Sequence, residues 1–158
     1  MTSRVDYCNT ILAAAPKTTT DRLERVLNAA ARVVSDIKTF DQGLSRLMHY
    51  YRLDIHKRVK YKLGMLTHRC LLGKAPVYLS NCCIPVAQVA TRRHLRSAAR
   101  HQLTVPRHRL STYGRRAFAV AGPTMFKALS DDLRDPAVST TRFGQSMKTH
   151  LFSAYQHV

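Results

Sequence analysis

Apolar residues recur every three or four positions between Asp21 and Ile37, a spacing typical of a helix with one apolar face. They are Leu23, Val26, Leu27, Ala30, Val33, Val34 and Ile37. Asp21 followed by Glu24 matches a capping box, so we expect the helix to begin at Asp21. The opposite face carries Arg22, Arg25, Asn28 and Arg32. Those arginines fit a solvated face and a phosphate-binding face equally well. A short amphipathic lead precedes this helix and ends at Pro16.

Two further helices are expected before Gly73. The first spans Phe40 to Tyr51, with Leu44, Leu47 and Met48 facing inward. The second covers about 55–72 and is capped by Asp54. Its apolar stripe is Ile55, Val59, Leu63, Leu66 and Cys70, and its basic residues are Lys57, Arg58, Lys60, Lys62 and Arg69. Gly73 is the expected C-terminal stop. Apolar stripes joined by short connections favour packing of these helices against one another.

The pattern changes after residue 73. One helical turn is expected within 75–83, and 84–101 has no clear period, which suggests a basic linker. Weak alternation in 102–107 and 113–120 predicts a small β-hairpin. Gly122 and Pro123 break the chain before a short amphipathic piece. Thr140 then caps a last helix, whose inward side chains are Phe143, Met147, Leu151 and Tyr155. The expected fold is mainly α: a helical bundle over 1–83, a linker over 84–101, and a small α+β region over 102–158.

Charge distinguishes this chain from an ordinary domain of its size. Its 158 residues hold 26 Lys and Arg against nine Asp and Glu, a formal net charge of +17. The stretch from Ile55 to Ser130 contains no acid and fifteen Lys or Arg. Such a stretch builds a positive field that neighbouring side chains do not cancel. The expected binding partner is a polyanion, and nucleic acid is the commonest one.

Several other classes of protein find little support. No apolar run is long enough to span a bilayer, and no signal-peptide segment is evident. Four cysteines, two of them adjacent, fit a reduced intracellular compartment better than a disulfide scaffold. The Cys and His spacing is not that of a zinc site. Cys70 lies on an apolar stripe and is expected in the core, whereas His56 and His68 are expected on the surface.

Catalytic chemistry also finds little support in the sequence. Asp131 and Asp132 form the one adjacent carboxylate pair, for which an exposed turn is a better explanation than a metal site. No nucleophile motif and no glycine-rich phosphate loop is present. We therefore expect no cofactor, no metal and no small-molecule substrate.

The strongest functional signal lies between Arg92 and Arg116. This segment has eight arginines, no acid, and His94, His101 and His108 between them. Arginine grips phosphate bidentately and stacks on bases. Tyr113 and Phe118 are placed to stack on bases, although Phe118 is equally well explained as a core residue. The candidate nucleic-acid-binding residues are Arg22, Arg25, Arg32, Lys57, Arg58, Lys60, Lys62, Arg92, Arg93, Arg96, Arg100, Arg107, Arg109, Arg115 and Arg116.

An ordered set of short motifs runs over nearly the whole chain. The motifs are Asp6-Tyr7-Cys8-Asn9-Thr10; Pro16; Arg22-Leu23-x-Arg25-Val26-x-Asn28-Ala29-Ala30-Ala31-Arg32; Leu53-Asp54-Ile55; Arg58-Val59-x-Tyr61-Lys62; Gly73-x-Ala75-Pro76-x-Tyr78-Leu79; Pro106-Arg107-x-Arg109-Leu110; Tyr113-Gly114-x-Arg116-Ala117-Phe118; and Phe143 with Leu151-Phe152. This set resembles the segment that follows the catalytic palm in non-LTR (LINE-type, jockey-like) retrotransposon reverse transcriptases, and its order is more specific than any one motif.

The resemblance implies a thumb-like helical region over 1–83 followed by the C-terminal region of such a polymerase. In that family the catalytic aspartates lie in the palm, upstream of the Asp6 segment, so a non-enzymatic fragment of an RNA-directed DNA polymerase is expected. Asp131 and Asp132 fall in the tail and do not replace them. Met1 to Val5 begins inside a helix of the family pattern, which suggests a truncated copy. The chain also lacks tryptophans that the family commonly has near His49 and Phe126.

Three interpretations remain open from the sequence. The first is a polymerase fragment that binds template–primer duplex or RNA through the backbone. The second is a free-standing basic RNA- or DNA-binding module, and the third is a retroelement relic without a selected function. In each case we expect an intracellular protein, and charge and resemblance suggest the nucleus.

Overall fold

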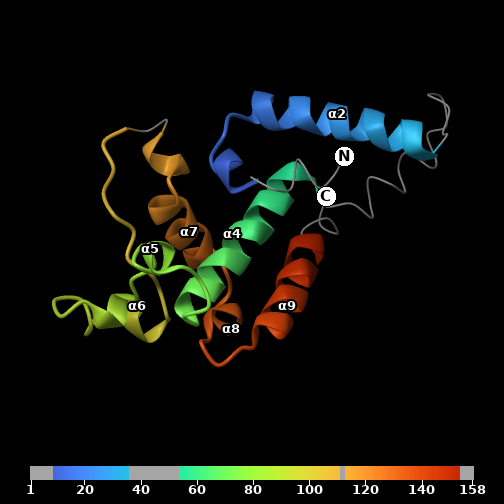
Figure 1. Cartoon of the computed structure of the whole chain (residues 1–158). Coiled ribbons are helices and arrows are strands. Elements are labelled where there is room, and N and C mark those ends of the chain that lie inside the picture. The colour runs from blue at the N-terminus through green and yellow to red at the C-terminus, as the bar shows by residue number, and fades with distance from the viewer. Residues whose placement is uncertain (1–8, 36–53, 111–112, 154–158) are drawn as a thin grey trace.

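The computed structural model of the chain describes residues 9–35, 54–110 and 113–153, and this part is mainly helical, as expected (Figure 1). The longer helices are α2 (Lys17–Ser35), α4 (Ile55–Leu71), α7 (Phe118–Lys127) and α9 (Thr140–Ser153). Shorter turns are η1 (Asn9–Leu12), α5 (Val77–Ser80), η2 (Val86–Gln88), α6 (Arg96–Ala99), η3 (Gly114–Arg116) and α8 (Asp131–Arg134). No helix in the described ranges is long and apolar enough to cross a membrane.

Helix α4 lies at the centre of the described part, between α7 and α9, with η1 and α2 against its N-terminal half (Figure 1). It begins where expected, because the Asp54 carboxylate accepts a 2.7 Å hydrogen bond from the Lys57 backbone N–H. It ends before Gly73, whose φ of +67° is readily adopted by glycine. Gly64 lets α7 and α9 approach closely: a Cβ there would meet Met125 Cε and Met147 Cε at 3.0 Å.

Two groups of buried side chains hold the helices together. The larger group joins the C-terminal half of α4 to α7, α8 and α9: Cys70, Cys83, Leu103, Phe126, Leu129, Leu133, Phe143, Met147 and Leu151. The smaller joins η1 and α2 to the N-terminal half of α4: Ala13, Leu27, Ile55, Val59, Leu63 and Ala121. Phe118 and Met125 pack against both groups, so core packing explains Phe118.

Helix α2 begins at Lys17 rather than at Asp21, which makes the predicted capping box wrong. The Pro16 carbonyl accepts from the Thr19 backbone N–H at 2.9 Å, so the helix starts directly after the proline. Glu24 is used elsewhere: its carboxylate accepts a 3.0 Å hydrogen bond from the Ile55 N–H and links α2 to the start of α4.

The apolar stripe of α2 is only partly covered within the described part. Leu27 is buried, but Val26 is 59% and Val33 is 82% exposed. The apolar stripe therefore predicted the helix correctly, but only part of the stripe is buried within the described residues. The helix predicted for 40–51, the lead before Asn9, and the positions of Ile37 and Tyr155 lie outside the described residues.

The predicted β-hairpin is wrong. Leu103 forms an isolated antiparallel bridge with Pro85 instead, supported by Val86 N–H to Gln102 O (2.9 Å) and Thr104 N–H to Ile84 O (2.8 Å). Residues 113–120 are largely helical and lead into α7, which runs through Gly122 and Pro123 rather than breaking there. Burial of apolar side chains on one side of α7 outweighs the hydrogen bond that Pro123 cannot donate.

The segment 84–101 carries more local structure than a linker suggests. It contains η2 and α6, and its side chains Val86 and Ala98 are buried. The bridge to Leu103 closes the segment into a compact arm beside the C-terminal end of α4, which we call the basic arm (residues 84–104; Figure 1). The domain boundaries at 83 and 101 stay a prediction.

Candidate nucleic-acid interface

The basic residues of α4 occupy the sides of the helix that the core leaves open. Lys60 and Lys62 are exposed, whereas Lys57 and Arg58 are half-buried. Burial lowers the pKa of Lys57; the nearby Asp54 carboxylate opposes this shift and Lys60 adds to it. The central position of α4 therefore restricts how many of its cations reach a ligand at once.

The three candidate arginines of α2 are exposed. Arg22, Arg25 and Arg32 lie on a helix that crosses near the N-terminal end of α4, away from the basic arm (Figure 1). The structure does not bring them together with the arginines of residues 92–100. The candidates thus fall on separate surfaces rather than in one site.

The basic arm presents its arginines to solvent. Arg92, Arg93 and Arg96 are exposed, and Arg93 donates from Nε to His94 Nε2 at 3.2 Å. None of the three lies within ion-pair distance of a carboxylate in the described part of the chain. Arg100 differs, because its guanidinium pairs with the Asp131 carboxylate at 3.1 Å. That ion pair ties the arm to α8.

The segment after the arm adds exposed cations and one aromatic ring. Arg107, Arg109 and Arg115 are exposed, and the Tyr113 side chain is 71% exposed. Arg116 is half-buried and donates to the Ile11 carbonyl at 3.3 Å, so it holds η1 in place. Tyr113 is the aromatic residue of this segment that remains accessible to a base.

Asp131 and Asp132 have different surroundings. The Asp131 carboxylate pairs with both Arg100 and Arg134. Arg134, which the sequence did not single out, is 4% exposed and also donates to the Lys127 carbonyl at 3.2 Å. Burial lowers the pKa of Arg134, and the neighbouring Arg100 adds to this shift. The i, i+3 spacing of Asp131 and Arg134 in the sequence could have indicated this ion pair.

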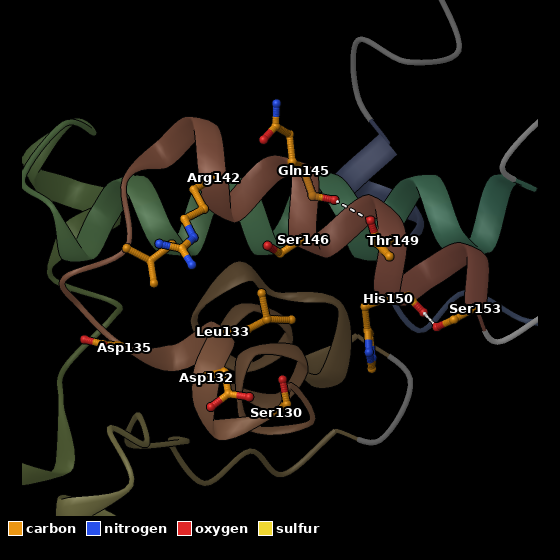
Figure 2. Close-up of a pocket in the computed structure, with 11 residues that line it drawn as sticks. Ser130, Asp132, Leu133, Asp135, Arg142, Gln145, Ser146, Thr149, His150 and Ser153 are labelled. Carbon is orange, nitrogen blue, oxygen red and sulfur yellow. Dashed lines mark hydrogen bonds between the residues drawn. The ribbon is translucent and has the colours of Figure 1, made fainter.

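Asp132 faces a polar cavity of about 730 Å³ between α8 and α9. Figure 2 shows Ser130 and Asp132 on the α8 side, and Arg142, Ser146 and Thr149 along α9. Two of the hydroxyls already donate to their own helix: Thr149 to the Gln145 carbonyl at 3.2 Å and Ser153 to the His150 carbonyl at 3.0 Å. The Asp132 carboxylate and the Arg142 guanidinium carry opposite charges, so the lining of this cavity does not favour an anion.

A second cavity, of about 630 Å³, brings together residues that are far apart in the sequence. We call it the aliphatic groove. Its walls come mainly from α4, α7 and α9, including Val59, Leu63, Val120, Met125, Leu129 and Leu151. Cationic and histidine side chains from α4, residues 108–115 and α9 also line it: His56, Lys57, Lys60, His108, Arg115 and His150. Three of the candidate residues thus line one cavity, which no sequence spacing had indicated.

Of the burial predictions for His56, His68 and Cys70, two are confirmed and one is wrong. His56 is exposed, as expected, but His68 is buried, which makes that prediction wrong. Its ring stacks on Phe143 with centroids 4.2 Å apart, and its Nε2 lies 3.1 Å from the Val138 carbonyl. The sequence could have indicated this burial, because His68 lies four positions after Gly64 and therefore on the same closely packed face of α4. Cys70 is buried as predicted, and burial raises the pKa of its neighbour Cys83 to about 12.

In the described ranges, no three His, Cys, Asp or Glu side chains gather closely enough to hold a metal ion. The exposed candidate cations lie on three surfaces of the described part: α2, α4, and the basic arm with the segment that follows it. No protein-family model, curated protein or solved structure matches this chain.

Proposed function

We propose that the chain binds the backbone of nucleic acid, RNA or an RNA–DNA duplex, through the basic arm and the segment that follows it. One observation carries the proposal: Arg92, Arg93, Arg96, Arg107 and Arg109 are all exposed and have no carboxylate partner in the described part of the chain. Unpaired, solvated guanidiniums are free to release counterions from phosphates on binding. Base readout is not part of the proposal, since phosphate contacts carry no sequence information.

We further propose that the chain is related to the thumb and post-palm region of a non-LTR retrotransposon reverse transcriptase. The ordered motifs support this relation, and a mainly helical fold agrees with a thumb-like region. On that view α2 and α4 would lie along the minor groove of a template–primer duplex, with Arg22, Arg25, Lys60 and Lys62 toward the phosphates. An intracellular and nuclear location belongs to the same proposal.

The test is a fluorescence-anisotropy titration with duplex and single-stranded nucleic acid at several salt concentrations. Each neutralised phosphate contributes about −0.7 to −0.9 to the slope of log K against log salt. Replacing Arg92, Arg93 and Arg96 by Ala should therefore make the slope shallower by about 2 to 3. A charge-matched control replaces Lys17, Arg142 and Lys148 by Ala and should leave the slope within about one unit of the original.

A slope near zero for the unaltered protein would refute backbone binding. Equal losses in the two triple variants would show a response to net charge alone, with no role for the arm. An unfolded protein by circular dichroism, with binding no tighter than polylysine, would favour the relic without a selected function. Tight binding that distinguishes sequences would favour a free-standing recognition module.

We propose no catalytic step, because the two adjacent carboxylates have different partners. The Asp131 carboxylate pairs with Arg100 and Arg134, whereas Asp132 lines the cavity between α8 and α9. The two carboxylates therefore do not converge on one metal ion. Incubation with primer, template, deoxynucleotides and Mg²⁺ should give no extension. Extension that is lost on replacing Asp131 and Asp132 by Asn would overturn this part of the proposal.

A further inference from the structure

The aliphatic groove has the properties of a built ligand site, and its lining contains none of the five arginines that carry the nucleic-acid proposal. Its volume of about 630 Å³ falls within the range of small-molecule pockets, ~300–1,000 Å³. The walls are aliphatic side chains from three helices, and several of them, such as Val59, Leu63 and Leu151, belong to the two buried groups. The groove is thus formed by packed core elements rather than by loops alone.

The charged groups that line the groove are all of one sign. Lys57, Lys60 and Arg115 are cationic, and the imidazole rings of His56, His108 and His150 lie among them. Among the described residues that line the groove there is no Asp and no Glu. Asp54 caps α4 through the Lys57 N–H, and its carboxylate partly offsets the Lys57 charge, so the positive charge of the groove comes chiefly from Lys60 and Arg115. A ligand seated among the aliphatic side chains therefore meets positive charge where it reaches the polar ones.

The lining also indicates which anions fit. For a nucleobase, the described lining residues offer histidine rings and the Arg115 guanidinium for stacking, but no Phe or Tyr ring and no Asn, Gln, Asp or Glu group to read the base edges. Among the non-basic lining residues the polar group is the Thr124 hydroxyl. An alkyl chain needs none of these contacts and gains free energy from leaving water.

We infer that the aliphatic groove binds a single-chain aliphatic anion, with the chain against Val59, Leu63 and Leu129 and the anionic head near Lys60 and Arg115. The head is a carboxylate or a phosphate, as in a free fatty acid or a lipid-derived monoester. This site goes beyond the proposed nucleic-acid binding and does not depend on it.

Isothermal titration of the full chain tests the inference with dodecanoate and dodecyl phosphate, each below its micelle concentration. We expect saturable 1:1 binding by at least one of the two, and their comparison identifies the preferred head. Octanoate should bind more weakly, by about threefold to fourfold per missing methylene. No saturable binding by either ligand, or affinity independent of chain length, would overturn the inference.

Substitutions separate the chain site from the head site. Ala128 and Thr124 are exposed lining residues of the α7 end, so Ala128→Trp and Thr124→Phe fill the groove without removing a buried side chain. Each should weaken dodecanoate at least tenfold, and a thermal melt checks that the variant folds. Unchanged affinity in a folded filling variant would refute the site.

The head is tested by charge reversal on α4. Lys60→Glu should weaken dodecanoate at least fivefold, because Lys60 lines the groove. Lys62→Glu is the matched control: the residue is exposed on the same helix but does not line the groove, so its effect should stay within twofold. Equal effects of the two reversals would show attraction by net charge and contradict a defined head site.

Discussion

At the scale of single residues, His68 is a buried, neutral side chain on the Lys- and Arg-rich helix α4. Its Nε2–H donates to the Val138 carbonyl, which leaves Nδ1 as the unprotonated nitrogen. Nδ1 is buried and has no hydrogen-bond partner in the part of the chain described. Burial lowers the pKa of His68; the Val138 hydrogen bond opposes the shift, and Lys74 adds to it. A second proton would thus place an unpaired charge against Phe143.

This pKa shift predicts a loss of stability in acid. The unfolded chain protonates His68 at a pKa of about 6.5, and the folded chain does so only at lower pH. Below pH 6.5 the unfolded state therefore binds more protons, and the free energy of unfolding falls by up to about 1.4 kcal/mol per pH unit until the folded His68 also titrates. Urea unfolding at pH 7.5 and 5.5 measures the fall.

His68→Gln is the matched variant, because its side-chain amide retains a donor for the Val138 carbonyl and does not titrate. The exposed histidines remain in both proteins, so the difference between the two pH dependences belongs to His68. A variant whose stability falls with pH as steeply as that of the unaltered protein would contradict the prediction.

At the scale of elements, the start of α4 is held by two carboxylates from different parts of the chain. Asp54 accepts from the Lys57 N–H within the helix, and Glu24 of α2 accepts from the Ile55 N–H. Backbone N–H groups in the first turn have no partner inside the helix, so both bonds satisfy donors that would otherwise need water. The helix that carries most of the core contacts is therefore also the best capped.

Removing the cap should destabilise the described fold widely, because α4 packs against η1, α2, α5, α7 and α9. We expect Asp54→Ala to lower the free energy of unfolding by about 1 kcal/mol. Asp54→Asn should cost much less, since Asn caps helices about as well as Asp. Urea midpoints of the two variants separate the cap from the charge. Equal losses would assign the effect to the charge beside Lys57 instead.

At the scale of the whole molecule, the distribution of charge matters more than its total. The acids of the described part are in α2 (Asp21 and Glu24), at the start of α4 (Asp54) and in the segment 131–135. Every charged residue between Asp54 and Asp131 is basic. Asp131 is already neutralised by Arg100 and Arg134. The basic arm and the groove are thus left with net positive fields, which favours fast, salt-dependent association with anions.

Local features of the sequence determined those elements whose signals lie within one helix. The apolar stripe of Ile55, Val59 and Leu63, the Asp54 cap and the Gly73 stop predicted α4 almost to the residue. The spacing of Phe143, Met147 and Leu151 likewise predicted α9, although Ser139 rather than Thr140 accepts from the Arg142 N–H. These features are set by neighbours three or four positions away, so periodicity alone is sufficient.

Only the tertiary structure decided the features that depend on distant partners. Leu103 pairs with Pro85 instead of forming the expected hairpin, and His68 is buried because Phe143 and Val138 cover it. The net charge of +17 and the run without acids indicated an anionic partner, but not which cations converge. Lys60 and Arg115 line one aliphatic groove because α4 and Arg115 lie beside α7 there. Such convergence depends on packing between elements, which no local spacing encodes.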